Sequence, residues 1–287
     1  MVVASFSFFL LMFVVIGVLS VRKRKETSYD YLLASHSVKP WLVALSAVAT
    51  NNSGYMFVGQ IGFTYQYGLS SIWLMIGWIF GDFLTSLFVH KRLRESTEKQ
   101  HALSFAGVLS HWGGRDFKYL RILGGVITLS FLGVYAAAQL NAGSKALHVL
   151  FGWDYAVGAV IGALIVVLYC FAGGIRASIW TDAAQSFVMI IAMALMLGIS
   201  LITLGGWGGF VDKLYMVSPD YMALFPTDLA FSSPVGPALF VLGWVFAGAG
   251  VIGQPHIMVR FMAMDNPQHM RRVRMYYYGW YSLFYVM

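Results

Sequence analysis

The chain has 287 residues, of which 59% are hydrophobic and only 11% are charged. Soluble domains carry about 25% charged residues, so this composition excludes a water-soluble globular protein and predicts one that uses a lipid bilayer as its solvent. The net charge of +7 does not indicate nucleic-acid binding, because the basic residues lie in short gaps between apolar runs and form no single cluster.

Apolar runs of the length needed to cross a bilayer follow one another along the whole chain. The predicted spanning helices cover roughly residues 2–21, 41–66, 69–90, 121–147, 153–174, 183–205, 236–259 and 273–287. The first run has no preceding positive charge and is followed by four basic residues, so it reads as a spanning helix rather than a cleavable signal. We therefore expect a multi-pass protein of the cell membrane, either a plasma membrane or a bacterial inner membrane.

The basic residues predict the orientation of these helices. If the N-terminus lies outside, all but two of the 19 Lys and Arg residues fall in cytoplasmic gaps, the exceptions being Lys145 and Lys213. This asymmetry strongly favours an outside N-terminus. The polar gap at 94–120 is expected to form a short amphipathic helix at the cytoplasmic interface. The proline-containing gap at 206–235 is expected to form an extracellular loop or cap.

Two of the predicted helices are interrupted near the middle of the membrane. Residues 49–54 read ATNNSG, and residues 247–255 read AGAGVIGQP. Interrupted helices in equivalent places of two halves indicate a transporter binding site, because unwinding frees carbonyl oxygens and half-helix ends. Close helix packing through small residues is the alternative for Gly248 and Gly250. Packing does not explain two adjacent asparagines, so the first interruption favours a site.

These segments resemble the sodium/solute symporter family, in particular its sodium/proline branch. The resemblance is carried by residues 45–54 (LSAVATNNSG), by residues 173–182 (GGIRASIWTD) with Gln185, and by residues 253–263 (GQPHIMVRFMA). It implies an all-α polytopic fold of the LeuT type, with five plus five core helices in inverted repeat. Because the chain stops within an apolar run, we expect it to be a fragment of a protein nearer twice its length.

The resemblance also implies a division of the single transmembrane domain, residues 1–287. Residues 1–40 form an extra N-terminal helix and a basic cytoplasmic loop, and residues 41–206 form the first five-helix repeat. Residues 207–235 form an extracellular loop, and residues 236–287 begin the second repeat, where the chain is truncated.

Sodium is the cofactor that the resemblance implies. Carried over by position, the carbonyl oxygens of Ala49 and Asn52 contribute to a sodium site, and Asp182 matches an aspartate that is linked to sodium in some members. A helix N-terminal acid favoured by the helix dipole is the alternative for Asp182. Asn51 stands where the proline branch has an aspartate, so it keeps the oxygen but loses the charge.

For the substrate, the resemblance points to the first, third and sixth core helices. The implied residues are Ser53, Gly54, Gln60, Tyr135, Gln139, Trp244, Ala247 and Val251. Ala247 and Val251 stand where the proline branch has aromatic side chains, which leaves the pocket wall smaller. Gln139 is equally compatible with an interhelical hydrogen bond, and Trp244 with a lipid-facing position.

Two charged residues suggest further roles. Asp82 lies well inside a predicted span, where an acid costs about 2.5–3.5 kcal/mol unless it faces protein or water. It is either a proton or cation relay or the partner of another helix. Arg260 is expected to anchor a cytoplasmic helix end and to pair with Asp265.

Together these features predict a transporter. We expect sodium-coupled symport of a small organic solute, such as proline or a related amino acid or carboxylate, by alternating access in the lipid bilayer. The alternatives are a symporter-like membrane sensor module and a proton-coupled transporter. No nucleophile–base pair, phosphate-binding loop or metal cluster occurs in the sequence, so an enzyme is not expected.

Overall fold

The computed structural model describes residues 2–218 and 220–287, and these are almost entirely helical. In chain order the elements are α1 (Val2–Val21), α2 (Ser28–Leu33), α3 (Pro40–Tyr55), α4 (Ile61–Tyr67), α5 (Ile72–Lys99), α6 (Phe105–Ser110), β1 (His111–Trp112), β2 (Arg115–Asp116), α7 (Lys118–Phe151), α8 (Tyr155–Thr203), α9 (Gly206–Tyr215), α10 (Val235–Ala249), α11 (Pro255–Met262) and α12 (Met270–Val286). Short 3-10 turns join α2 to α3, α4 to α5, α10 to α11 and α11 to α12.

Five helical segments of the described chain are long and apolar enough to cross a bilayer: Val3–Val21, Val58–Lys99, Lys118–Phe151, Cys170–Thr203 and Val235–Gly253. Tyr155–Leu168 is a shorter apolar segment. The predicted runs all coincide with helices. Not every predicted run forms a helical segment long enough to cross a bilayer. Helix α3 ends at the first interruption, and α12 begins with a polar turn.

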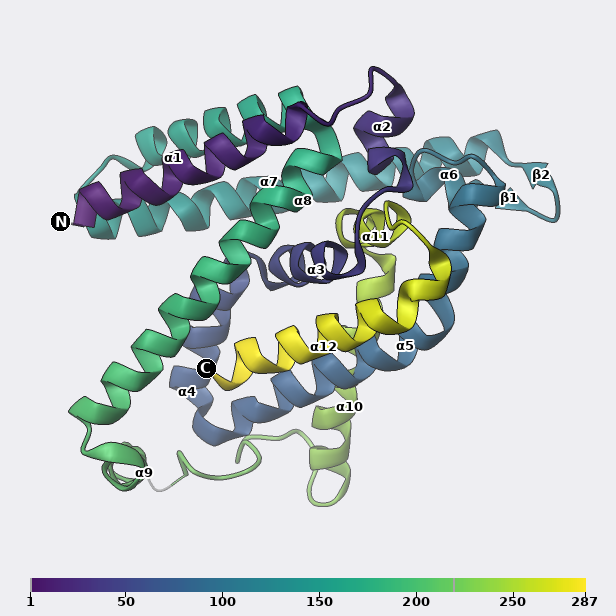
Figure 1. Cartoon of the computed structure of the whole chain (residues 1–287). Coiled ribbons are helices and arrows are strands. Elements are labelled where there is room, and N and C mark those ends of the chain that lie inside the picture. The colour runs from purple at the N-terminus through teal and green to yellow at the C-terminus, as the bar shows by residue number, and fades with distance from the viewer. Residues whose placement is uncertain (1, 219) are drawn as a thin grey trace.

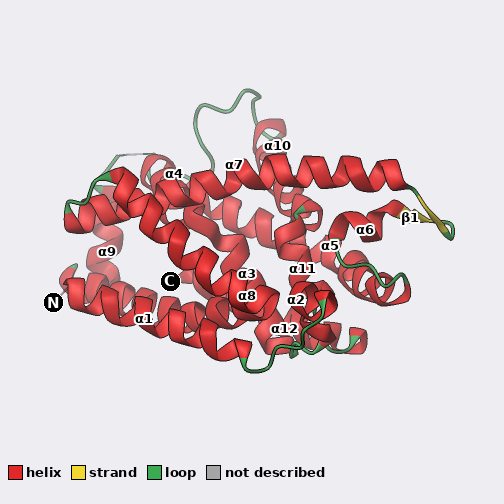
Figure 2. Cartoon of the chain, turned by 90° about the horizontal axis from the view of Figure 1, so that it is seen from above, coloured by secondary structure: helices red, strands yellow, loops and turns green. Residues whose placement is uncertain are grey.

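The helices form two groups that α8 connects (Figure 1). In one group, α1 and α7 pack along the first half of α8. In the other group, α3 packs against α11 and α12, and α5 packs against α10. The core of buried apolar side chains lies mainly in this second group. The view from above shows α1 at the edge of the molecule and the β1–β2 hairpin beyond one end of α7 (Figure 2).

The helix predicted for residues 41–66 is broken in the middle. Ser53 has φ 43° and ψ −178°, which no residue inside a helix adopts. A single π-helical stretch, Met56–Gln60, then leads into α4. Adjacent asparagine, serine and glycine favour such a break, because their side chains compete for backbone hydrogen bonds or leave the backbone unconstrained.

The second interruption separates α10 from α11. A 3-10 turn, Gly250–Gly253, follows α10, and Gln254 has an extended backbone. Pro255 then occupies the first turn of α11, where its missing N–H costs nothing. Glycine and proline thus end one helix and begin the next, as the sequence predicts.

Helix α8 replaces two predicted spans and the gap between them. It runs for 49 residues, about 74 Å if it were straight, and is therefore too long for one crossing. It bends at Gly174, which has φ 56° and ψ −147°. A Cβ atom on Gly174 would lie 2.3 Å from the carbonyl oxygen of Tyr31, so this close approach requires glycine. The predicted gap at residues 175–182 is wrong, since the chain resumes its helix directly after one bend.

The gap at 94–120 contains a short helix, as predicted, but α5 occupies its beginning. Helix α5 continues to Lys99, supported by ion pairs that Lys91 and Arg94 make with Glu95 and Glu98 one turn later. Only α6 and the β1–β2 hairpin occupy the remainder. The predicted loop at 206–235 likewise begins with a helix, α9.

The bend of α8 is held by the connection between α1 and α3. Arg176 donates a 2.6 Å hydrogen bond to the Asp30 carboxylate and further bonds to the Ala34 carbonyl and the Ser37 hydroxyl. Both charged side chains are nearly inaccessible, with exposed fractions of 11% and 2%. Arg24 donates to the Ala172 carbonyl just before the bend. These contacts fasten the N-terminal segment to α8.

Candidate functional site

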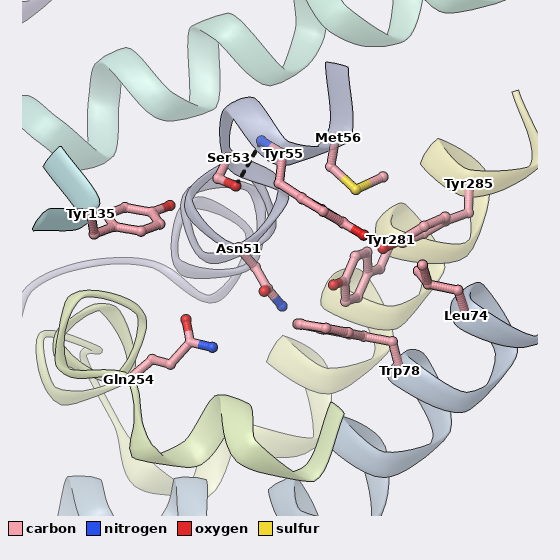
Figure 3. A pocket seen from close by; sticks show the side chains of 10 residues that line it. All are labelled: Asn51, Ser53, Tyr55, Met56, Leu74, Trp78, Tyr135, Gln254, Tyr281 and Tyr285. Atoms are coloured by element: carbon pink, nitrogen blue, oxygen red, sulfur yellow. Dashed lines mark hydrogen bonds between the residues drawn. The ribbon is translucent and has the colours of Figure 1, made fainter. Parts of the chain in front are cut away.

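The two interrupted helices meet at one cavity. It has a volume of about 190 Å³ and lies among five elements (Figure 3). The lining residues are Asn51, Ser53, Tyr55, Met56, Leu74, Trp78, Tyr135, Gln254, Tyr281 and Tyr285. The first interruption contributes Asn51 and Ser53, and the second contributes Gln254. We call this space the central cavity.

The lining of the central cavity carries no formally charged side chain. Its polar groups are two amides, a serine hydroxyl and tyrosine hydroxyls, and its remaining walls are aromatic rings and apolar side chains. Ser53 accepts a 3.2 Å hydrogen bond from the Tyr55 N–H, which supports the turn after the break. Asn51 donates a 3.0 Å hydrogen bond to the Tyr277 hydroxyl behind the cavity wall. Such a cavity suits a small solute with no net charge.

Two of the predicted substrate residues, Ser53 and Tyr135, line the central cavity. Tyr135 comes from α7 and packs against His256 of α11, with 4.8 Å between the ring centroids and a tilt of 39° between the rings. It therefore connects the cavity to the beginning of α11. Ser53 brings its hydroxyl to the cavity because the helix breaks at its own backbone.

Gly54 and Gln139 form an interhelical hydrogen bond. The Gln139 side-chain oxygen accepts from the Gly54 N–H at 2.6 Å. This N–H lies directly after the break, where the helix no longer supplies a partner within the preceding turn. Gln139 thus caps the helix that resumes after the break. Of the two roles that its sequence position allowed, substrate contact and an interhelical hydrogen bond, it has the second.

Replacing Gln139 with leucine is expected to lower the free energy of unfolding by about 1–3 kcal/mol, because the part-buried Gly54 N–H would lose its partner. Thermal unfolding in detergent, followed by tryptophan fluorescence, measures the change. The same substitution at the exposed Gln66 is the control and should change stability by less than about 0.5 kcal/mol. Equal effects of the two variants would show that Gln139 does not act as a cap.

The remaining predicted substrate residues lie away from the central cavity. Gln60 lines a separate outer cavity of about 440 Å³ together with Thr64 and Tyr221. Trp244 packs its ring against Phe63 at 5.5 Å. Val251 is fully buried in the core. Ala247 is half-buried on α10, beside Gly248, and is not among the residues lining the central cavity.

The cavity residues on α5 and α12 were not predicted from the sequence. Leu74 and Trp78 come from α5, and Tyr281 and Tyr285 come from α12. Both pairs have the i, i+4 spacing that places side chains on one helix face. That spacing was the available signal, but it does not distinguish a cavity wall from ordinary core packing. Gln254 lies within the Gly-Gln-Pro motif of the second interruption, so its sequence position indicated the site more clearly.

Asp182 lies in a polar cluster between α3, α8 and α11. One of its carboxylate oxygens accepts hydrogen bonds from Ser46 at 2.7 Å, Arg260 at 3.2 Å and Ser178 at 3.4 Å. Arg260 also donates to both serine hydroxyls. The exposed fractions of the Asp182 and Arg260 side chains are 17% and 10%, so the ion pair is largely shielded from water.

The expected pairing of Arg260 with Asp265 is therefore wrong. Asp265 contacts His269 at 3.2 Å instead. Arg260 lies in the last turns of α11 and is nearly buried against α8 and α3, whereas Asp265 comes after the end of α11. Sequence proximity suggested the wrong partner because the helix directs the arginine toward the core.

Ala49 and Asn52, the predicted carbonyl ligands, lie on the last turns of α3 before the break. The Asn52 carbonyl accepts a hydrogen bond from the Met56 N–H. Its side-chain amide is buried and has no hydrogen-bond partner among the residues that the structure describes. Ser46, one turn before Ala49, joins this helix to Asp182. The predicted sodium residues thus belong to neighbouring parts of α3 and α8.

The chain is similar to proteins of one family over nearly its whole length. Residues 31–287 match the model of the sodium:solute symporter family. The chain is 33% identical over 262 residues to the high-affinity proline transporter PutP of Bacillus subtilis, covering 91% of this chain and 54% of the relative. It is 32% identical over 276 residues to the sodium/proline symporter of Staphylococcus aureus strain JH9, covering 96% and 52%. It thus spans about half the length of these relatives.

A solved structure supports the same fold. The chain superimposes with a TM-score of 0.80 on a Na+-coupled sialic acid symporter in a substrate-bound outward-open state, at 19% identity, covering 98% of this chain and 59% of that one. This likeness confirms the predicted LeuT-like helical fold. Together with the family match over residues 31–287, it leads to one conclusion: the chain belongs to the sodium:solute symporter family.

Proposed function

We propose that the protein carries out sodium-coupled symport of a small organic solute across the cell membrane. The observation that carries this proposal is the meeting of two interrupted helices at the central cavity, with Asn51 and Ser53 from one and Gln254 from the other. Two discontinuous helices facing one mid-membrane cavity are typical of secondary transporters that work by alternating access.

The proposed solute is small and has no net charge, as a zwitterionic amino acid such as proline does. A cavity of about 190 Å³ admits a molecule of only a few non-hydrogen atoms. Amide and hydroxyl groups supply hydrogen bonds to a carboxylate or an amine, and the rings of Trp78 and Tyr281 supply apolar contact. The named relatives are proline transporters, which agrees with this class of solute.

The proposed sodium site lies along α3 and α8. Carbonyl oxygens at Ala49 and Asn52 are hard ligands of the kind that small cations prefer. Asp182 adds a carboxylate nearby, although Arg260 already pairs with it. Because a guanidinium and a sodium ion compete for one carboxylate, we propose that Asp182 binds sodium only when Arg260 moves away.

The proposed division of the chain follows from the same fold. Residues 1–40 precede the core, and residues 41–206 form its first five-helix repeat. Residues 207–235 connect the repeats, and residues 236–287 begin the second one. The positions of the two interruptions, early in each repeat, agree with this inverted arrangement.

Sodium-dependent binding of proline tests the proposed function. We expect radiolabelled proline to bind the full gene product in nanodiscs at least about tenfold more tightly in sodium chloride than in choline chloride. Substituting Gln254 with alanine should weaken binding by about tenfold, because one hydrogen bond to the solute is worth about 1 kcal/mol or more. The exposed Gln66 serves as the matched control, and its alanine variant should bind like the parent.

Two results would contradict the proposal. Proline binding that is equal in sodium and choline would remove sodium coupling. Unchanged binding by the Gln254 variant would place the solute outside the central cavity. If proline fails to bind but another zwitterionic amino acid binds in a sodium-dependent manner, the mechanism stands and the solute changes.

A further inference from the structure

A stripe of polar side chains runs along the buried face of α5. Asp82, Ser86, His90 and Arg94 follow one another at i, i+4 spacing, so they lie above one another on one side of the helix. Each has an exposed fraction of 1% or less. The proposed symport makes no use of this stripe. Burying several polar groups in a membrane helix costs free energy, so such groups indicate a function.

Asp82 is the acidic member of the stripe and has the most unusual surroundings. It is fully buried, and neither carboxylate oxygen makes a hydrogen bond among the described residues. Next to it, the backbones of α5 and α10 touch, since a Cβ on Gly81 would lie 1.9 Å from the Val245 carbonyl oxygen. An ionised carboxylate in this position would have neither water nor a positive partner to stabilise its charge.

The groups that face Asp82 are neutral hydroxyls on α12. Tyr277, Tyr278 and Tyr281 are the side chains of α12 that lie near the carboxyl group. The segment that forms α10, Val235–Ala249, contains no titratable residue. The cations of this region lie farther along the stripe, where Arg274 donates to the Ser86 carbonyl at 3.4 Å.

We propose that Asp82 is a proton-binding site inside the membrane bundle that carries its proton at neutral pH and communicates with the central cavity through Tyr277. A protonated carboxyl is uncharged and gains an O–H donor, which the neighbouring tyrosine oxygens accept. A proton needs no space beyond one O–H bond, whereas a sodium ion needs several oxygen ligands around it. The closed packing beside Gly81 therefore favours the proton.

Tyr277 connects this site to the cavity. Its hydroxyl accepts the 3.0 Å hydrogen bond from Asn51, and Asn51 lines the central cavity. The same side chain lies next to Asp82. A change in the protonation of Asp82 therefore alters the hydrogen-bonding role of Tyr277 and, through it, the orientation of the Asn51 amide. Solute occupancy and protonation become linked, because each affects the same hydroxyl.

His90 provides a route between Asp82 and the end of α5. Its ring stacks on Phe261 at 3.8 Å between centroids, and neither ring nitrogen has a hydrogen-bond partner among residues 2–218 and 220–287. A neutral imidazole has one donor and one acceptor nitrogen, so it passes a proton on without holding a charge. Ser86 lies one turn from each of the two residues, and its hydroxyl donates to the Phe83 carbonyl at 2.7 Å, which leaves its oxygen free to accept.

Infrared spectroscopy of the protein in nanodiscs tests the proposal without any transport assay. We expect the carbonyl-stretch band of a protonated carboxylic acid at neutral pH, its loss in Asp82→Asn and its retention in Asp228→Asn, which changes an exposed acid in the same way. Absence of the band from the parent, or its persistence in the Asp82 variant, would overturn the proposal. If Asp82→Asn fails to fold, Asp82→Glu keeps the carboxyl and should shift the band.

The links to Tyr277 and His90 have their own readouts. Removing the hydroxyl in Tyr277→Phe should shift the band of Asp82, whereas Tyr276→Phe, at an exposed tyrosine, should not. His90→Phe should slow the shift of the band after transfer into heavy water, and His101→Phe at the surface should leave the rate unchanged. A band insensitive to Tyr277→Phe would separate the site from the cavity. An unchanged exchange rate would remove His90 from the route.

Discussion

Replacement of Arg176 by alanine is expected to lower the free energy of unfolding by about 3–5 kcal/mol. The change leaves Asp30 buried without its guanidinium partner and removes the donors to Ala34 and Ser37. A buried charge that loses its partner costs far more than the pair itself contributes. The loss should appear as a large decrease of the melting temperature in detergent.

An exposed ion pair supplies the matched control. Arg121 and Asp116 lie 2.9 Å apart with exposed fractions of 47% and 36%, so Arg121→Ala should cost no more than about 1 kcal/mol. Comparable losses in the Arg121 and Arg176 variants would contradict the structural role assigned to the buried pair.

The pair also predicts a dependence of stability on pH. Burial alone would raise the pKa of Asp30, but hydrogen bonds from Ser35, the Lys25 N–H and Arg176 outweigh it and hold that pKa below its usual range. A depressed carboxyl pKa stabilises the fold above the ordinary titration range, and this contribution is lost as the pH falls through the folded-state value. Acidification should therefore destabilise the parent more than the Arg176 variant.

The second large effect is expected at the contact between α5 and α10. Gly81→Ala places a Cβ 1.9 Å from the Val245 carbonyl oxygen, which belongs to the backbone and cannot rotate away. The helices must separate, and such overpacking costs about 1–3 kcal/mol or more. Chemical denaturation of the Gly81 variant in mixed micelles measures this loss.

Gly125 offers the opposite expectation for the same substitution. No atom lies within 4 Å of a Cβ built there, so Gly125→Ala on α7 should stabilise its helix by about 0.5–1 kcal/mol. The two variants are therefore expected to change stability with opposite signs. A stabilising effect at both positions would mean that the backbones of α5 and α10 do not touch.

The sequence predicted the features of the fold that depend on local chemistry. Both helix interruptions were expected, because serine, asparagine, glycine and proline act on the backbone where they stand. The bend of α8 was missed since a single glycine, Gly174, causes it, and the partner that requires glycine is the distant Tyr31 carbonyl. Such long-range contacts leave no signal in the neighbouring sequence.

The candidate site was also predictable only in part. Ser53 and Tyr135 were identified, and they line the central cavity. Trp78 and Tyr281 were not identified, since only the packing of α12 against α3 and α5 turns their faces toward it. Trp244, for which the sequence left both the pocket and the lipid open, packs against Phe63.

The comparisons confirm the broader predictions. Membership of the sodium:solute symporter family confirms the expected multi-pass membrane protein, and the named relatives are transporters. The family also implies sodium as the coupling ion. The outside N-terminus stays a prediction, although the α1–α3 connection, the end of α5 and the α11–α12 connection lie on one side of the bundle as it requires (Figure 1).

The buried stripe on α5 has a consequence for biogenesis. Its cover comes from α10, α11 and α12, yet ribosomes complete α5 more than a hundred residues before α10 begins at Val235. At usual rates of synthesis this interval lasts on the order of ten seconds. During that time Asp82 and His90 lie on α5 without the helices that bury them in the folded protein, α10, α11 and α12. We expect the membrane-insertion machinery, rather than other helices of the chain, to keep these polar side chains away from lipid during this stage of synthesis.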